Sequence, residues 1–282
     1  MVGAEFAVGP LVLALVPDGT ESGPSEVGVP DVGEAVACLR EAVDRSPVAA
    51  QTLAGLLRLT SAASLADGLL AESLAYSMLM SGAEYRRWLE ARPRREVPAP
   101  VAPAVLLERD EDVLTVTLNR PERHNAFSRW VRDGLCEAFD LAGADDSIAS
   151  VVLRGAGASF CSGGDLEEFG TTPDLAAAHL IRLDRSVAAR LDAVRERVTV
   201  RLHGACIGAG IELASFAGRV VAHPDSVIRL PELAMGLVPG AGGTVGITRR
   251  IGPWRTAYVA LTGAPLPVAT ALRWGLVDDV AP

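Results

Sequence analysis

Two glutamates with apolar neighbours are the residues of this chain best suited to chemistry. Glu212 lies between Ile211 and Leu213, and Glu232 follows Pro231 after a strand-like run. A carboxylate among apolar side chains is costly unless it has a partner or a task, and two such acids are the usual material of general acid–base catalysis. Taken alone, Glu212 also fits a plain structural role, an acid stabilised near a helix N-terminus.

Two glycine-containing turns offer backbone N–H donors beside these acids. The first, Ser162-Gly163-Gly164-Asp165, follows a predicted strand over 150–154, and Asp165 suits the N-cap of a following helix. The second, residues 204–210, follows a predicted strand over 198–202 and opens the helix that carries Glu212. Because glycine has no Cβ, the backbone of both turns can come close to a ligand, and their amides can face an anion.

Composition narrows the function classes. The chain has 282 residues, 49% of them hydrophobic, and a formal net charge of −9. This length and apolar content predict a globular protein with a packed core, and the acidic balance argues against a nucleic-acid binder. All the basic residues apart from the histidines are arginines, whose planar guanidinium suits phosphate binding.

The four cysteines are far apart and form no CxxC pair. This spacing predicts neither a metal site nor a disulfide framework. Cys161 and Cys206 lie beside the two glycine turns, which leaves a nucleophilic role open, although buried packing is the ordinary role of a free cysteine.

No segment reads as a membrane span or a secretory leader. The apolar stretch 6–16 contains Pro10 and has no basic segment before it, and no run approaches the roughly 20 apolar residues that a membrane helix requires. We therefore expect a cytoplasmic protein without a membrane partner.

The first 92 residues read as a mostly helical region. A strand is expected within 1–16 and a loop over 18–33, followed by helices over 34–45, 47–59, 64–81 and 83–91. One face of the third helix is expected to pack, because apolar residues recur along it at helical spacing. These residues are Leu65, Leu69, Leu70, Leu74 and Met78.

A proline-rich linker is predicted over 93–104, because each proline restricts its own backbone and that of the preceding residue. From 105 the pattern changes to a hairpin, then an amphipathic helix over 126–141, then a helix over 174–194. Further strands are expected over 219–222 and 226–230. The alternation of strands and helices predicts an α/β region over 105–282.

From about residue 105 onward the chain resembles the enoyl-CoA hydratase/isomerase family, also called the crotonase family. The matching motifs occur in the family's order, and they are Asn119-Arg120-Pro121 with Asn125-Ala126, Ser162–Leu166, Gly204–Leu213, Pro231-Glu232, Pro239–Thr244 and Gly275-Leu276-Val277. The resemblance implies an α/β fold, a spiral of ββα units, which here follows the mostly α-helical N-terminal region.

The resemblance also implies a substrate and a site. The substrate is an acyl thioester of coenzyme A, no further cofactor is expected, and the amides of Gly164 and Ala209 form the oxyanion hole. Most relatives have glycine where Ala209 stands, and alanine suits a backbone donor if its φ is negative. Glu212 and Glu232 are the implied catalytic acids. The implied substrate- and CoA-binding residues are Arg123, Asn125, Ala126, Ser162, Gly163, Asp165 and Gly208. Arg120 is an alternative to Arg123 for a phosphate contact, and Arg120 is equally well explained as a surface charge beside Glu122.

By the same resemblance the activity is that of an enoyl-CoA hydratase, which adds water through a stabilised enolate. Three alternatives stay open: an isomerase, a cofactor-free arylacetyl-CoA dioxygenase, and a non-catalytic acyl-CoA-binding or scaffold subunit. The assembly implied is a homotrimer or a dimer of trimers. The acyl group, and which glutamate is acid and which is base, are not determined.

Two features depart from the family pattern. Relatives continue beyond the Gly275-Leu276-Val277 segment into helices that cover the acyl pocket, whereas this sequence ends at Pro282 and has about a hundred additional N-terminal residues. Our hypothesis is that residues 34–91 supply this cover, on the same chain's pocket or a neighbour's. The alternative is a separate helical module with an unrelated partner.

Overall fold

Valine- and leucine-rich strands after residue 104 build a six-stranded sheet in the computed structural model, which describes residues 3–93, 96 and 99–282. The strand order is β11-β9-β7-β6-β5-β4. The β4–β5 pair is the predicted antiparallel hairpin, and the other neighbours are parallel. The bounds are β4 (Val105–Asp110), β5 (Val113–Leu118), β6 (Ser150–Gly155), β7 (Val198–Leu202), β9 (Arg219–Ala222) and β11 (Asp279–Val280).

A second, smaller sheet lies beside the two predicted glycine turns. β8 (Ala205–Ile207) pairs in parallel with β10 (Val227–Arg229), and a parallel bridge joins Cys206 of β8 to Cys161. A strand of the large sheet is thus followed by a short segment of the small one, as β7 is by β8 and β9 by β10. This repeat, the ββα spiral, brings the Cys161–Gly164 turn beside the end of β8.

The helices of this region differ from the sequence prediction at two places. The predicted helix over 126–141 begins later, because Ser128 caps it by accepting from the Val131 amide. The predicted helix over 174–194 is broken at Ser186, which caps α7. The bounds are α5 (Arg129–Ala144), α6 (Leu175–Asp184), α7 (Val187–Ala193), α8 (Ala209–Ala214), α9 (Gly243–Thr262), α10 (Val268–Trp274) and the 3₁₀ turns η1 (Pro121–Arg123), η2 (Arg195–Arg197) and η3 (Glu232–Met235).

The N-terminal segment forms a three-stranded sheet rather than one strand and a loop. β1 (Ala4–Val8) and β2 (Leu11–Pro17) pair as an antiparallel hairpin, and β3 (Glu26–Val29) adds in parallel to β2. Gly9 turns the hairpin with a φ of +51°. The apolar run therefore folds back on itself, and β3 comes from residues predicted as loop.

The four predicted N-terminal helices are confirmed. They are α1 (Val32–Arg45), α2 (Pro47–Thr60), α3 (Leu65–Met80) and α4 (Ala83–Glu90). Asp31 caps α1 and Ser64 caps α3 through bonds to backbone amides, and Pro47 at the first position of α2 has no amide to satisfy there.

The face that α3 buries agrees only in part with the predicted one, because Leu69 is buried and Leu65 half-buried while the other three predicted residues are exposed. Leu70, Leu74 and Met78 are 40%, 52% and 48% exposed, whereas Glu72 and Ser73 are buried. α3 packs its polar and small residues against α6 and α9, with which it makes most of its contacts outside the N-terminal region. The hydrophobic pattern failed here because hydrogen bonds offset the cost of burying the polar side.

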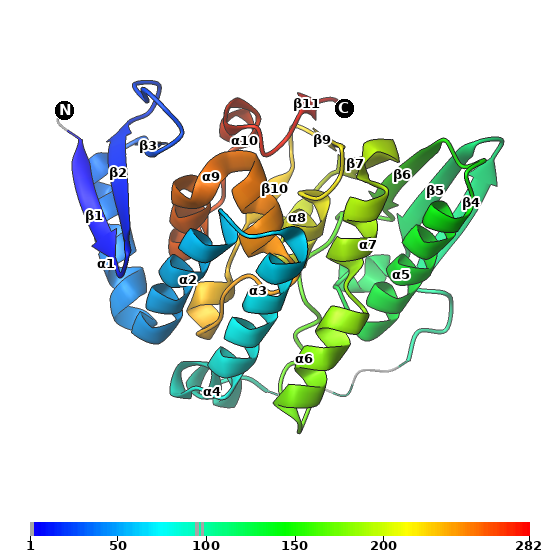
Figure 1. The fold of residues 1–282 in the computed structure, drawn as a ribbon, viewed down its shortest axis with the longest axis horizontal. Helices are drawn as coiled ribbons and strands as arrows, with labels where there is room; N and C mark the ends of the chain where they lie inside the picture. The colour runs from blue at the N-terminus through cyan, green and yellow to red at the C-terminus, as the bar shows by residue number, and fades with distance from the viewer. Residues whose placement is uncertain (1–2, 94–95, 97–98) are drawn as a thin grey trace.

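The N-terminal helices pack directly on the α/β region, residues 105–282, which is called the second region below. α2 and α1 lie along α9, and α3 lies between α9 and α6 (Figure 1). Buried side chains of both regions, such as Leu57 of α2 and Ile247 of α9, belong to one hydrophobic core. Within the predicted linker over 93–104, residues 94–95 and 97–98 lie outside the described residues. Among the helices described, none combines the length and hydrophobicity needed to cross a bilayer.

Candidate active site

Six of the predicted site residues meet at one cavity of about 310 Å³. Both glycine turns and both acids contribute to its wall. These residues are Ser162, Gly163, Gly164, Ala209, Glu212 and Glu232. The topology explains the meeting, because the bridge between Cys161 and Cys206 holds the two turns side by side.

The two glycine corners are in direct backbone contact. Gly163 has a φ of +94° and Gly208 a φ of +50°, in the region that favours glycine. A Cβ on Gly208 would lie 3.6 Å from the Gly163 Cα and 2.4 Å from Glu232 Oε1. Glycine at 208 therefore makes room for the acid, although Gly208 does not line the cavity.

The predicted oxyanion amides are next to these corners. The Gly163 carbonyl accepts from the Phe127 amide at 2.7 Å and the Phe127 carbonyl accepts from Asp165 at 2.9 Å, so Gly164 is held between two bonds. Ala209 is the first residue of α8, and its φ is negative, as alanine requires. Among the described residues neither the Gly164 nor the Ala209 amide has a protein acceptor.

Glu212 is buried in α8 and is fixed by the backbone of the loop that precedes α9. Its Oε2 accepts from the Ala241 amide at 2.8 Å and from the Gly243 amide at 2.9 Å. The loop closes tightly on the acid, because a Cβ on Gly243 would lie 2.6 Å from Glu212 Cγ. The sequence predicted the acid but not this loop as its support.

Glu232 is the first residue of η3 and has fewer partners. Its Oε2 is buried and has no hydrogen-bond partner among the described residues. An unpaired buried oxygen is costly in a structural acid and is suited to binding a ligand or water.

Burial raises the pKa of both acids, to about 8 for Glu232 and well above its ordinary value for Glu212. The charges of Glu232 and of Glu72 raise the pKa of Glu212 further, while the amides of Ala241 and Gly243 act in the opposite direction. Acids that interact in one cavity titrate as a group. Near neutral pH such a group therefore still holds a proton that it can donate.

Several wall residues were missed in the sequence. Tyr76 of α3, Phe127, Phe169, Arg182 of α6 and Met235 all line the cavity. The guanidinium of Arg182 lies 5.1 Å from the ring centroid of Tyr76, and its Nε donates to Ser73 Oγ at 3.0 Å. Glu72 and Tyr76 stand four positions apart in α3, and this spacing was the available signal.

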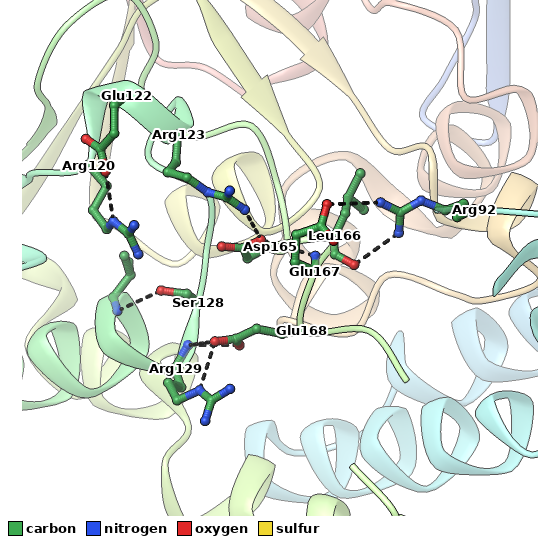
Figure 2. A network of polar contacts seen from close by, with 11 residues as sticks. Arg92, Arg120, Glu122, Arg123, Ser128, Arg129, Asp165, Leu166, Glu167 and Glu168 are labelled. Carbon is green, nitrogen blue, oxygen red and sulfur yellow. Dashed lines mark hydrogen bonds and ion pairs between the residues drawn. The ribbon is translucent and has the colours of Figure 1, made fainter. Parts of the chain in front are cut away.

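Arginines hold the turn that follows Gly164, as Figure 2 shows. Arg123 pairs with Asp165 at 2.6 Å and Arg129 with Glu168 at 3.0 Å. Arg92, from the N-terminal region, donates to the Leu166 carbonyl at 3.0 Å. The turn thus connects three separate segments of the chain.

The prediction that Asp165 caps a helix is wrong. Residues 166–170 form turns, and the next helix is α6. Because Asp165 is 2% exposed and paired with Arg123, both residues anchor the turn, and neither lines the cavity.

Asn125 and Ala126 also lie behind the cavity wall. The Asn125 side chain donates to the Ala156 and Ser159 carbonyls at 2.9 and 2.8 Å and accepts from the Arg120 amide. With a φ of +53° it shapes the turn after η1. Its side-chain hydrogen bonds are thus made within the protein, so any contact with a ligand would use the backbone.

The cysteines near the turns have a structural environment. Burial raises the pKa of Cys161 and of Cys206 to about 12, so both are thiols at neutral pH, whereas a nucleophile needs the thiolate. In the described part of the chain, no group of three or more His, Cys, Asp or Glu side chains is arranged to hold a metal ion.

Comparison with known proteins gives consistent matches to the second region. A family model for enoyl-CoA hydratase/isomerase matches residues 108–282. The chain is 35% identical over 178 residues to 2,3-dehydroadipyl-CoA hydratase of Escherichia coli, covering 63% of this chain and 69% of the relative. It is 33% identical over 181 residues to 1,2-epoxyphenylacetyl-CoA isomerase of the same organism, covering 62% and 69%.

Solved structures agree. An enoyl-CoA hydratase from Thermoplasma volcanium superposes with a TM-score of 0.58 at 33% identity, over 64% of this chain and 72% of that one. An enoyl-CoA hydratase from Mycobacterium smegmatis gives 0.59 at 31% identity, over 64% and 70%. The expected crotonase-like fold is confirmed.

Proposed function

This chain belongs to the enoyl-CoA hydratase/isomerase family, whose members act on acyl-CoA thioesters, and we propose that it adds water across the double bond of an α,β-unsaturated acyl-CoA. One observation carries the proposal. Two buried acids, Glu212 and Glu232, face the cavity that Gly164 and Ala209 also line.

The thioester oxygen accepts hydrogen bonds from the amides of Gly164 and Ala209. These donors stabilise the enolate that forms when water attacks the β-carbon, because they point to where negative charge develops. Loss of one such donor typically costs about 10²–10³ in rate, roughly 3 kcal/mol. The absence of a protein acceptor for either amide among the described residues supports this assignment.

The two glutamates carry the protons. One takes a proton from the attacking water, and the other delivers a proton to the α-carbon. The pair gains one proton and loses one, so its total charge is unchanged, and a proton passes from the first acid to the second before the next turnover. The raised pKa values support the proton-delivering role, because a carboxyl whose pKa is raised by burial still holds a proton near neutral pH. Migration of a double bond needs only one proton carrier, so the second acid favours hydration.

Glu232→Gln tests the proposal. Because the amide side chain cannot exchange the proton, we expect turnover of crotonyl-CoA to fall by about 10²-fold or more with little change in CoA affinity. Loss of the conjugated thioester absorbance measures hydration.

Three other results would redirect the proposal. Full activity of the Glu232→Gln protein would place the chemistry elsewhere. Oxygen uptake with an arylacetyl-CoA would indicate a dioxygenase, and binding of thioesters without turnover would indicate a scaffold subunit.

A further inference from the structure

Four consecutive amides before and at the start of α9 alternate between two carboxylates. Ala241 and Gly243 donate to Glu212 Oε2, as described above. Gly242 donates to Glu72 Oε1 at 2.7 Å, and Thr244 donates to Glu72 Oε2 at 2.9 Å. Each carboxylate therefore binds every second amide of the segment 241–244. If one carboxylate is displaced, the amides that donate to the other carboxylate move as well.

Glu72 lies outside the part of the chain that matches the family model. It comes from the middle of α3 and is 2% exposed. Its Oε2 also accepts from the Thr244 hydroxyl at 2.6 Å, and Thr60 of α2 donates to the Thr244 carbonyl at 2.7 Å. A buried carboxylate is retained at low cost only when its lone pairs are satisfied, and here the satisfying groups belong to the loop that fixes Glu212.

We propose that Glu72 is a positioning residue for Glu212, acting through the Ala241–Thr244 backbone that the two carboxylates share. This inference rests on the proposed function, because it assumes that Glu212 takes part in the hydration. Through α3, the N-terminal region thus sets the geometry of a catalytic acid as well as covering its cavity.

The charges around Glu72 predict a pH signature. It faces Arg182 of α6, Glu212 of α8 and Glu232 of η3, and the small cavity beside it is also lined by Arg132 and Arg185. Burial raises the pKa of Glu72 to about 7, so it is largely ionised above that pH. Its negative charge then disfavours ionisation of Glu212, and its removal lowers the pKa of Glu212.

Glu72→Gln in the full-length chain tests the proposal. An amide presents an NH₂ group to one of the two backbone donors, so the loop is no longer held on both sides. We expect kcat for crotonyl-CoA to fall about 10-fold with KM little changed. The alkaline limb of the pH–kcat profile should move down by roughly one pH unit.

Glu84→Gln is the matched control. Glu84 of α4 also accepts from two consecutive amides, Val48 at 2.9 Å and Ala49 at 3.0 Å, but these begin α2. The control is expected to lower stability without moving the pH profile. Glu72→Asp keeps the charge but shortens the side chain, so it loosens the loop. It should lower kcat and move the alkaline limb up, because the Ala241 and Gly243 amides that lower the pKa of Glu212 are held less closely.

Two further experiments test the proposal if Glu72→Gln folds poorly or if no turnover is found. Thr244→Val removes only the hydrogen bond from the Thr244 hydroxyl to Glu72. Loss of this bond raises the pKa of Glu72, so the alkaline limb should move in the same direction as in Glu72→Gln, but by less. Infrared titration of the carboxyl groups, with Glu212 assigned by difference from Glu212→Gln, needs no turnover. Ionisation of Glu212 at higher pH in Glu72→Asp supports the proposal, because the charge is kept while the Ala241 and Gly243 amides that lower the pKa of Glu212 are held less closely. This result would stand even if no enoyl-CoA is hydrated, which would sink only the proposed function. An unchanged Glu212 titration in Glu72→Asp, or an equal shift in Glu84→Gln, would overturn the proposal.

Discussion

Residues 108–282 and residues 3–93 contribute unequally to the cavity. The family-matching region supplies the turn at Gly163, the two acids and wall side chains such as Phe127 and Met235. The N-terminal region supplies side chains that brace or close these parts, namely Glu72, Tyr76 and Arg92. The difference teaches that both proposed catalytic acids come from one region, whereas the other region adds side chains that support them or complete the wall.

The largest expected effect is that of removing the N-terminal region. A chain that begins at residue 105 would expose the apolar side of α9, where Val245, Ile247 and Ile251 are buried. We expect it to lose cooperative unfolding in circular dichroism and to hydrate no crotonyl-CoA. A well-folded, active truncated protein would break the comparison, because the N-terminal helices would then be dispensable.

A second prediction tests whether the two regions unfold as one unit. Leu57 of α2 is fully buried, and we expect Leu57→Ala to lower the free energy of unfolding by about 2–5 kcal/mol. Leu59 is 52% exposed, so Leu59→Ala on the same helix should change it by less than about 0.5 kcal/mol. Urea unfolding followed by circular dichroism measures both, and two separate transitions would argue for independent modules.

The smallest expected effect concerns the wall that Tyr76 forms. The ring packs on Gly240, where a Cβ would lie 2.3 Å from the Tyr76 ring. Tyr76→Ala should enlarge the cavity and raise kcat/KM for longer acyl chains relative to crotonyl-CoA by about 10-fold. Tyr76→Phe keeps the ring and is the control, expected to preserve the chain-length preference. An unchanged preference in both variants would mean that α3 does not border the acyl group.

The sequence predicted the elements whose signals are local. Glu212, Glu232 and the glycine turns stand in motifs of recognisable spacing. The N-terminal helices were predicted from their helical pattern, and in the structure Asp31 and Ser64 cap two of them. These features depend on neighbours along the chain or on short-range backbone geometry.

What the sequence did not predict depends on distant partners. Glu72 is separated from Thr244 by 172 positions. Of the five apolar residues predicted to pack on one face of α3, Leu70, Leu74 and Met78 are exposed. Asp165 was predicted to cap a helix because it follows a glycine turn. Its actual partner, Arg123, lies 42 positions earlier in the chain, and no local pattern indicates that pairing. Long-range hydrogen bonds override local hydrophobic and capping patterns in both cases.

The most direct measurement is a structure of the full-length chain with a saturated acyl-CoA bound. We predict the thioester oxygen within hydrogen-bond distance of the Gly164 and Ala209 amides, with the α- and β-carbons facing Glu212 and Glu232. A thioester bound away from these amides, or with its β-carbon out of reach of both acids, would contradict the account.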